Sequence, residues 1–320
     1  THIFVLSTHP DKPRWHLHSS IRCMPESSRA SFHDWLQGAR PHTWANAFAP
    51  VVAGTGAAAW SGSTSIYRAM LAMVVAWTLI VGVNYANDYS DGIRGTDDDR
   101  QGPQRLTGSG LAKPEHVKYA AFGAFALASV AGTLLSVMSS WWLIAVGALC
   151  ILAAWFYTGG KHPYGYTGWG ECAVFVFFGL VAVCGTEYTQ AGRVTWVGVT
   201  CAVSIGCFSA AVNLANNLRD IPSDTDSGKR TLAVRLGDRG TRRLWLGLVA
   251  VPYLSTLVLA TQCVPTLAAL AALLLTRLAA SPVMRGATGP ALIPVLGLTG
   301  RAMLAWSVLT AAALAFSAGA

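Results

Sequence analysis

The chain has 320 residues, of which 53% are hydrophobic and only 12% are charged. Soluble domains carry charged residues at about twice that frequency, so the composition excludes an ordinary soluble protein and predicts a polytopic membrane protein. The net charge of +8 does not indicate nucleic acid binding, because the basic residues are concentrated between the apolar segments. The seven cysteines form no CxxC pair, so we expect small core residues rather than metal ligands or disulfide partners.

The first segment, Thr1–Ser31, is polar and contains several His, Pro and Arg residues. Its apolar patch, Ile3–Leu6, is too short for the core of a signal peptide. We therefore expect residues 1–31 to form a disordered extension, with Met24 as a candidate start of translation. Residues 32–320 are expected to form a single membrane domain.

The rest of the chain predicts an all-α fold. A membrane-spanning helix needs about 20 largely apolar residues, and nine segments approach this length after a short interfacial helix at Phe32–Arg40. Tryptophans stand near the ends of several of these segments, as is typical of interfacial aromatic residues. The nine predicted spans, forming one bundle, are Trp44–Trp60, Ser65–Tyr89, Val117–Met138, Trp141–Tyr157, Trp169–Thr189, Trp196–Leu218, Thr241–Thr261, Pro265–Ala280 and Thr299–Ala318.

The distribution of lysine and arginine predicts the orientation of the bundle. With the N-terminus in the cytoplasm, 21 of the 23 Lys and Arg residues fall on the cytoplasmic side, and only Arg68 and Arg193 fall on the other. This asymmetry predicts a multi-pass protein of the cell membrane with a cytoplasmic N-terminus and an odd number of spans. We expect part of the basic excess to face anionic membrane lipid or an anionic substrate.

Two similar acidic segments end the second and the sixth predicted spans. Val83–Asp91 reads VNYANDYSD and Val212–Asp220 reads VNLANNLRD, so five of nine residues match. Four crossings separate the two segments, which places both on the cytoplasmic side. Asn84, Asp88 and Asp91 are spaced so that they share one face of a helix. We therefore predict that two acidic helix ends form one cytoplasm-facing active site.

Oxygen ligands favour a hard divalent cation at this site. Mg²⁺ is typically held by a few carboxylates, by water and by substrate phosphates, and Mn²⁺ is an alternative because oxygen ligands suit both. Arginines and lysines follow both acidic segments, which favours a diphosphate bound through its metal. The predicted metal ligands are Asn87, Asp88, Asp91, Asp97, Asn217, Asp220 and Asp224, and the predicted catalytic residues are Asp88, Asp91, Asp220 and Asp224.

The segment Trp155–Glu171, WFYTGGKHPYGYTGWGE, is rich in glycine and aromatic residues and contains a single Lys or Arg, Lys161. Glycine allows the backbone to approach a ligand closely, and tyrosine rings can stabilise a cation, including a carbocation. The pattern therefore predicts part of a substrate pocket, with an ordinary glycine-rich turn as the alternative.

Simpler roles remain open for several of the predicted site residues. Asp97 belongs to a run of three acids that is suited to hydration in a loop. Asn84 and Asn213 lie deepest in their spans and are suited to hydrogen bonds between helices. Lys229 and Arg230 are also consistent with positive charge on the cytoplasmic side.

These segments resemble the intramembrane aromatic prenyltransferase superfamily. Asn87-Asp88-x-x-Asp91 and Asp220-x-x-x-Asp224 are similar to its two aspartate-rich motifs, although Gly95 replaces a third aspartate of the first motif and Asp97 follows two residues later. Further segments resemble the members that prenylate 1,4-dihydroxy-2-naphthoate in menaquinone biosynthesis. They are ARPHTW (Ala39–Trp44), NDYSDGIRGTD (Asn87–Asp97), YTGGKHPYGYTGWGE (Tyr157–Glu171), NNLRDIPSD (Asn216–Asp224) and GKRTLAVRLG (Gly228–Gly237).

The resemblance implies that Mg²⁺ joins the two motifs to the diphosphate of a polyprenyl donor. The allylic C–O bond then ionises, and the ring of 1,4-dihydroxy-2-naphthoate attacks the carbocation with loss of CO₂, which gives demethylmenaquinol. Arg94, Lys161 and Lys229 are implied to neutralise the diphosphate. The full set of implied substrate-binding residues is Arg40, Asn84, Arg94, Tyr157, Lys161, Tyr164, Tyr166, Asn213, Lys229 and Arg230.

Two other functions remain open. One is the same fold with another aromatic acceptor, such as 4-hydroxybenzoate or haem, although those relatives usually carry a Lys-Arg pair in place of the Gly/Tyr run. The other is a divalent-cation transporter, whose site is expected near the bilayer midplane rather than at one membrane face. The oligomeric state is not predicted by the sequence.

Overall fold

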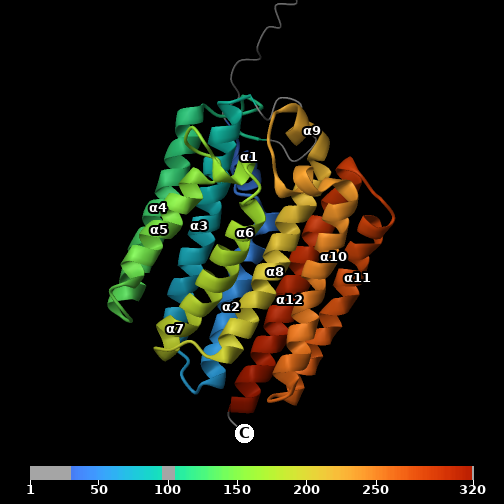
Figure 1. The fold of residues 1–320 in the computed structure, drawn as a ribbon. Helices are drawn as coiled ribbons and strands as arrows, with labels where there is room; N and C mark the ends of the chain where they lie inside the picture. Colours follow the sequence, from blue (N-terminus) through green and yellow to red (C-terminus); the bar gives the residue numbers. More distant parts are fainter. Residues whose placement is uncertain (1–29, 96–104, 319–320) are drawn as a thin grey trace, which may run out of the picture.

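The computed structural model describes residues 30–95 and 105–318, and within these ranges all regular secondary structure is helical (Figure 1). The prediction of an all-α fold is confirmed. The elements are α1 Phe32–Gly38, η1 Pro41–Thr43, α2 Ala45–Trp60, α3 Ile66–Gly92, α4 Pro114–Val137, α5 Leu143–Phe156, η2 Tyr164–Tyr166, α6 Gly170–Val174, η3 Phe175–Cys184, α7 Gly185–Ala191, α8 Trp196–Arg219, α9 Ile221–Asp226, α10 Leu232–Ala260, η4 Val264–Ala272, α11 Leu273–Met284, η5 Gly289–Leu292 and α12 Ile293–Ala318.

The helices of the described residues include seven that are long and apolar enough to cross a membrane, so the protein is a multi-pass membrane protein. The predicted count of nine is not matched, because α2 and α5 contain only 16 and 14 residues and fall short of a full crossing. The seven spans are α3, α4, the continuous segment α6–η3–α7, α8, α10, η4–α11 and η5–α12.

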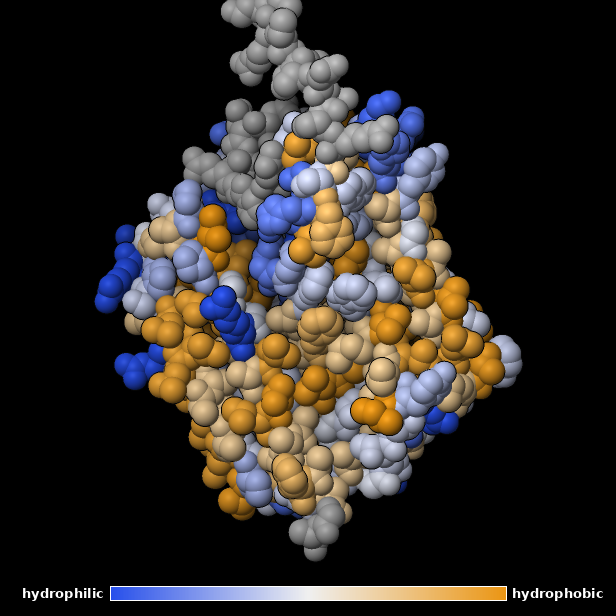
Figure 2. Space-filling model, turned by 180° about the vertical axis from the view of Figure 1, so that it is seen from behind, coloured by the Kyte–Doolittle hydropathy of each residue, from blue (hydrophilic) through white to orange (hydrophobic). Residues whose placement is uncertain are grey.

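The surface agrees with this assignment. Hydrophobic side chains cover most of the middle of the molecule, and hydrophilic side chains gather mainly at one end (Figure 2). Figure 1 shows that α9 and the last turns of α3 and α8 lie at this polar end, whereas the C-terminus lies at the other. The two predicted acidic helix ends therefore share one end of the bundle.

Hydroxyl side chains begin several of the helices. Ser65, Thr195 and Thr231 precede α3, α8 and α10, and each side-chain oxygen accepts a hydrogen bond from a backbone N–H in the first helical turn. Such N-caps satisfy donors that the helix itself leaves without a partner. Ser65 and Thr195 thus fix the start of α3 and α8, the two helices whose last turns carry the acidic segments.

The bundle packs as two unequal parts. The larger core joins α2, α8, α10, α11 and α12, and it contains the fully buried side chains of Phe208, Trp245 and Trp306. Smaller clusters join α3 to α4 around Ala86 and Phe125. Because α8 has 78% of its apolar stretch buried, more than any other span, it is the central helix against which the rest are placed.

Close helix packing at the centre depends on glycine. A Cβ at Gly54 of α2 would lie 2.5 Å from the carbonyl oxygen of Val183 and 2.8 Å from Cβ of Thr186. A Cβ at Gly179 of η3 would lie 2.6 Å from Cα of Gly206 in α8. Small residues let helix backbones approach closely in membranes, where packing rather than hydrophobic burial drives association.

We predict that Gly54→Ala destabilises the protein, although alanine is intrinsically the better helix former. Overpacking of this kind typically costs about 1–3 kcal/mol. The matched control is Gly247→Ala in α10, where a Cβ would meet no atom within 4 Å. Thermal unfolding of the two purified variants in the same detergent should show a lowered midpoint for Gly54→Ala alone, and equal midpoints would contradict the packing argument.

Candidate active site

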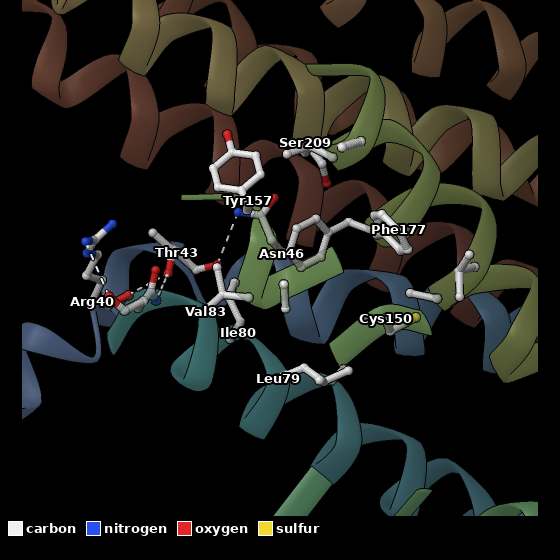
Figure 3. Close-up of a pocket in the computed structure, with 18 of the residues that line it drawn as sticks. Arg40, Thr43, Asn46, Leu79, Ile80, Val83, Cys150, Tyr157, Phe177 and Ser209 are labelled. Atoms are coloured by element: carbon white, nitrogen blue, oxygen red, sulfur yellow. Dashed lines mark hydrogen bonds between the residues drawn. The ribbon is translucent and has the colours of Figure 1, made fainter. Parts of the chain in front are cut away.

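A cavity of about 610 Å³ lies between the two parts of the bundle and is lined by residues of α2, α3, α4, α5, η3, α8 and α12. Its walls are mainly apolar: Leu79, Ile80 and Phe177 border it in Figure 3. Ala72 and Asp88, sixteen residues apart on α3, both line it, which corresponds to a length of about 24 Å. The cavity therefore suits a long apolar group.

One end of the cavity is polar. The side chains there come from the segment before α2, from the last turns of α3 and α8, and from the loop after α5. They include seven of the predicted site residues, namely Arg40, Asn84, Asn87, Asp88, Tyr157, Tyr164 and Asn213. Residues that the sequence analysis grouped together thus line one cavity, although they lie on elements far apart in the chain.

Asp88 anchors the segment that precedes α4. Its side chain is fully buried, and its Oδ2 and Oδ1 accept hydrogen bonds from the backbone N–H groups of Leu106 (2.9 Å) and Thr107 (2.8 Å). A buried carboxylate is stabilised by such hydrogen bonds. Asp88 was predicted as a metal ligand, and the structure gives it in addition a role in shaping the site.

Asn84 and Asn87 join α3 to two other segments. Asn84 Nδ2 donates to the carbonyl oxygen of Ala39 and to Oγ1 of Thr43, both at 3.0 Å. The Oδ1 of Asn87 accepts a hydrogen bond of 2.7 Å from Thr158, which follows α5. The contacts of Asn84 agree with the alternative role given to it from the sequence, hydrogen bonding between elements.

Arg40 has an unusual backbone conformation. Its φ of +51° makes it the one non-glycine residue with positive φ in the part of the chain that the structure describes. Such a conformation costs free energy for a side chain with Cβ and persists where the surroundings hold it. The contact from Arg40 Nη2 to the backbone oxygen of Asn84, at 3.5 Å, ties this strained residue to the motif helix.

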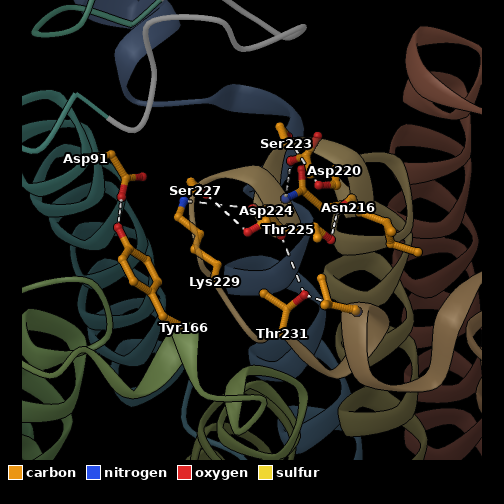
Figure 4. A network of polar contacts seen from close by, with 12 residues as sticks. Asp91, Tyr166, Asn216, Asp220, Ser223, Asp224, Thr225, Ser227, Lys229 and Thr231 are labelled. Carbon is orange, nitrogen blue, oxygen red and sulfur yellow. Dashed lines mark hydrogen bonds and ion pairs between the residues drawn. The ribbon is translucent and has the colours of Figure 1, made fainter.

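Tyr166 connects the two acidic motifs (Figure 4). Its hydroxyl donates to Oδ1 of Asp91, and Arg105 Nη2 lies 3.9 Å from Oδ2 of the same carboxylate. Lys229 Nζ and the guanidinium carbon of Arg94 lie 4.5 Å and 5.7 Å from the centre of the Tyr166 ring. One cation from each motif, Arg94 from the first and Lys229 from the second, therefore contacts the same aromatic ring.

The second motif is held by its own basic neighbours. Arg219 donates to both carboxylate oxygens of Asp220, from Nε at 2.6 Å and from Nη2 at 2.7 Å. Lys229 Nζ lies 3.9 Å from Oδ1 of Asp224, and Thr231 Oγ1 donates to Oδ2 of Asp224 at 3.5 Å. Figure 4 shows Asp91 on one side and Asp220 with Asp224 on the other, with Lys229 between them.

Two partly buried polar pairs join α8 to the loop after α5 and to α6. Asn217 Nδ2 donates to Oε1 of Glu171 at 2.7 Å, and Tyr157 donates to Oδ1 of Asn213 at 3.4 Å. Nδ2 of Asn213 and Oε2 of Glu171 are buried without a hydrogen-bond partner. An unpaired buried polar atom is costly, so the Asn213 amide beside the cavity is suited to a polar group of a ligand.

The predicted cations fall into two groups. Arg94 and Lys229 lie against Tyr166, whereas Lys161 and Arg230 line a separate, smaller cavity of about 280 Å³ together with Arg235. Tyr166 contributes to the wall of this second cavity. None of these four cations lines the larger cavity, and the prediction that they bind substrate stays a prediction.

Two titratable groups at the polar end have shifted pKa values. Desolvation and, second, the positive charge of Arg219 lower the pKa of His42, which favours the neutral imidazole at pH 7. Burial raises the pKa of Tyr164 to about 12. Its hydroxyl is therefore protonated at pH 7, in agreement with the 2.8 Å hydrogen bond that it donates to the carbonyl oxygen of Ala153.

The acidic residues do not form a complete metal centre by themselves. Within residues 30–95 and 105–318, no three His, Cys, Asp or Glu side chains lie close enough together to hold a metal ion. Asp97, another predicted ligand, lies outside the described residues. The carboxylate and amide oxygens nevertheless fit Mg²⁺, which usually takes few protein ligands and completes its shell with water and substrate phosphate.

Several polar residues of the cavity were not among the predicted site residues, and three of them lie at its polar end. Arg105, Asn216 and Arg219 line it, and Arg105 and Arg219 are 9% and 6% exposed. For Asn216 and Arg219 a signal was present, because they lie three residues apart on α8 and Asn216 lies three residues after Asn213. Arg105 belongs to the basic residues that follow the first acidic segment, but its burial was not predictable, since it depends on the contact of its loop with Asp88.

Residues 47–285 match the model of the UbiA prenyltransferase family. The chain is 58% identical, over 90% of its length and 98% of the relative's, to 1,4-dihydroxy-2-naphthoate octaprenyltransferase of Mycobacterium tuberculosis. It is 38% identical, over 69% of its length and 74% of the relative's, to the enzyme of the same name from Escherichia coli. The family match spans both acidic segments, Val83–Asp91 and Val212–Asp220.

Solved structures show the same fold. A UbiA homologue from Aeropyrum pernix K1 gives a TM-score of 0.65 at 14% identity, covering 85% of this chain and 97% of that one. A UbiA homologue from Archaeoglobus fulgidus bound to DMAPP and Mg²⁺ gives 0.52 at 14% identity, covering 87% and 99%. Fold and site thus define an intramembrane prenyltransferase, and the chain belongs to the UbiA prenyltransferase family.

We predict that Asp88→Asn loosens the segment before α4. An asparagine has a single carbonyl oxygen, and its NH₂ group cannot accept the second backbone N–H. Hydrogen bonds to a charged group contribute about 1.5–3 kcal/mol, so amide hydrogen exchange at Leu106 and Thr107 should accelerate at least about tenfold. Glu115→Gln, at an exposed carboxyl of α4, serves as the control. Unchanged protection at both amides would show that Asp88 does not anchor this segment.

Proposed function

We propose that this chain transfers a long-chain polyprenyl group from polyprenyl diphosphate to 1,4-dihydroxy-2-naphthoate, with release of diphosphate and CO₂, to give demethylmenaquinol. The observation that carries the proposal is the 610 Å³ cavity, which is apolar along α3 and whose polar end is lined by Asp88, by arginines and by two tyrosines. This arrangement matches an amphiphilic donor with an apolar tail and a diphosphate head. The relatives from M. tuberculosis and E. coli, both named for this reaction, support the choice of acceptor.

The proposed donor site places the tail against α3, α5 and η3 and the diphosphate at the polar end. Asp91, Asp220 and Asp224 would hold Mg²⁺, together with amide oxygens of Asn87 and Asn217 and with Asp88 and Asp97 as further predicted ligands. Bound Mg²⁺ would neutralise the charge that develops on the leaving diphosphate. Arg94 and Lys229 would add positive charge there, because both already lie between the two motifs.

The proposed acceptor site lies where Tyr157, Tyr164 and Asn213 line the cavity. The two tyrosine rings are 5.4 Å apart in an edge-to-face arrangement. Their electron-rich faces would stabilise an allylic carbocation, and the apolar wall would keep water away from it. Arg40 and the unpaired Nδ2 of Asn213 would orient the polar groups of the naphthoate.

The proposal also places the enzyme in the cell membrane with its N-terminus and the polar end of the cavity in the cytoplasm. The 21-to-2 distribution of Lys and Arg supports this orientation. In intact cells, a membrane-impermeant thiol reagent should fail to label a cysteine introduced at Arg230 and should label one introduced at Arg193. Labelling at position 230 and not at position 193 would show that the protein has the opposite orientation.

Transfer assays with an acceptor panel test the reaction. Purified protein is supplied with octaprenyl diphosphate, Mg²⁺ and either 1,4-dihydroxy-2-naphthoate, 4-hydroxybenzoate or no acceptor. We expect a prenylated, decarboxylated product from the naphthoate alone, lost with EDTA. Product from 4-hydroxybenzoate instead would overturn the acceptor assignment while keeping the reaction class.

Two neighbouring residues of α9 give a matched pair of variants for this assay. Asp224→Ala removes a buried motif carboxylate and should abolish transfer, because a lost metal ligand weakens stabilisation of the leaving group. Asp226→Ala removes an exposed carboxylate on the same short helix and should retain activity. Equal activity of the two variants would show that Asp224 is not part of the catalytic site.

A further inference from the structure

Arg219 is the last residue of α8 and is only 6% exposed. It lines the polar end of the large cavity, whereas Asp220 does not. Its Nε and Nη2 both donate to the Asp220 carboxylate, and Nη2 also donates to Oδ1 of Asn216 at 2.9 Å. The guanidinium therefore lies between the cavity and the first carboxylate of the second motif.

The guanidinium still has unused hydrogen-bonding capacity. It carries five N–H donors in a rigid fork, and the contacts to Asp220 and Asn216 involve only Nε and Nη2. Nη1 has no acceptor among the residues that the structure describes. Nη1 is not one of the side-chain atoms that are buried without a partner, and Arg219 lines the large cavity. The guanidinium is therefore accessible from the cavity and is suited to an oxyanion that enters it.

The ion pair also limits what Asp220 can do. Two short, charge-assisted hydrogen bonds occupy one lone pair on each carboxylate oxygen. A divalent cation at Asp220 would in addition be repelled by the guanidinium at close range, an interaction that little water screens at this burial. Metal binding at Asp220 and the contact with Arg219 therefore oppose each other.

We propose that Arg219 is the counterion of Asp220 in the substrate-free protein and becomes a ligand of a substrate oxyanion when substrate and metal bind. This inference rests on the proposed prenyl transfer, which supplies two oxyanions: the diphosphate of the donor and the carboxylate of the acceptor. The entering anion neutralises Arg219, and Asp220 is released to the metal. The buried site thus keeps its charges paired in both states.

Loss of the guanidinium should strengthen the binding of metal and weaken the binding of substrate. In Arg219→Gln, Asp220 loses its competing counterion, so Mn²⁺ alone should bind roughly tenfold more tightly. The KM of the substrate whose oxyanion contacts Arg219 should rise at least about tenfold, because a charge-assisted fork is lost. A purely structural role would not produce both changes.

Arg219→Lys separates charge from geometry. It retains the positive charge beside Asp220, so the affinity for Mn²⁺ should stay near that of the unchanged protein. It lacks the planar fork, so the same KM should still rise. The matched control is Arg242→Gln, because Arg242 pairs with Asp238 on α10 through Nε and Nη2 in the same way but does not line the cavity; neither constant should change.

The experiment uses the full chain, purified in detergent, and measures Mn²⁺ binding by electron paramagnetic resonance without substrate, then KM for each substrate in transfer assays. A raised KM for the donor assigns Arg219 to the diphosphate, and a raised KM for the naphthoate assigns it to the carboxylate. Unchanged Mn²⁺ affinity in Arg219→Gln, or unchanged KM for both substrates, would overturn the inference.

Failure of the inference is distinguishable from failure of the proposed function. If the unchanged protein transfers no prenyl group, the proposed reaction is wrong, while Mn²⁺ binding still reports on the ion pair. If Arg219→Gln does not fold, as judged by thermal unfolding, Arg219→Lys decides: a KM equal to that of the unchanged protein for both substrates overturns the role as an oxyanion ligand.

Discussion

The polar end of this protein depends on how four motif carboxylates are stabilised beside an apolar bundle. A buried carboxylate is costly unless hydrogen bonds and counterions compensate it. Two backbone N–H groups hold Asp88, Tyr166 and Arg105 hold Asp91, Arg219 holds Asp220, and Lys229 with Thr231 holds Asp224. These contacts join the segment before α4, the loop containing η2, the end of α8 and the start of α10, so the motif charges also organise the fold at this end.

The same arrangement separates the two chemical environments that an amphiphilic donor requires. Close packing through Gly54 and Gly179 brings α2, η3 and α8 together in the membrane, while α3 and α5 stand away from them and leave the apolar cavity. The charged groups are confined to one end of that cavity. In the proposed reaction, a prenyl tail and a diphosphate head would be bound at once, and ionisation would take place at the boundary between the two environments.

Part of the site was predictable from short-range pattern. The repeated Asn and Asp spacing in Val83–Asp91 and Val212–Asp220 placed two acidic ends on the same side, and the Gly/Tyr segment placed Tyr157 and Tyr164 at a pocket. The contacts of Asn84, Asp88 and Arg219 were not predictable in this way, because the local pattern does not encode which segment approaches each side chain. Asn84 contacts Ala39 and Thr43, Asp88 contacts Leu106 and Thr107, and Arg219 lines the cavity. The count of nine spans exceeded seven because the short segments Trp44–Trp60 and Trp141–Tyr157 were counted as spans, whereas α2 and α5 within them contain only 16 and 14 residues.

The sequence by itself determined the class of protein, the helical character of the chain, the chemistry of the motifs and the end of the bundle where they meet. These properties follow from composition, apolar segment length and helical periodicity, which act over one or two helices at a time. Only the tertiary structure decided which partner holds each carboxylate, that Lys161 and Arg230 line a separate cavity, and that Arg219 lies between Asp220 and the large cavity. The reason is physical: hydrogen bonds and ion pairs depend on distances of a few ångströms between segments far apart in the chain, and those distances are set by the packing of all the helices together.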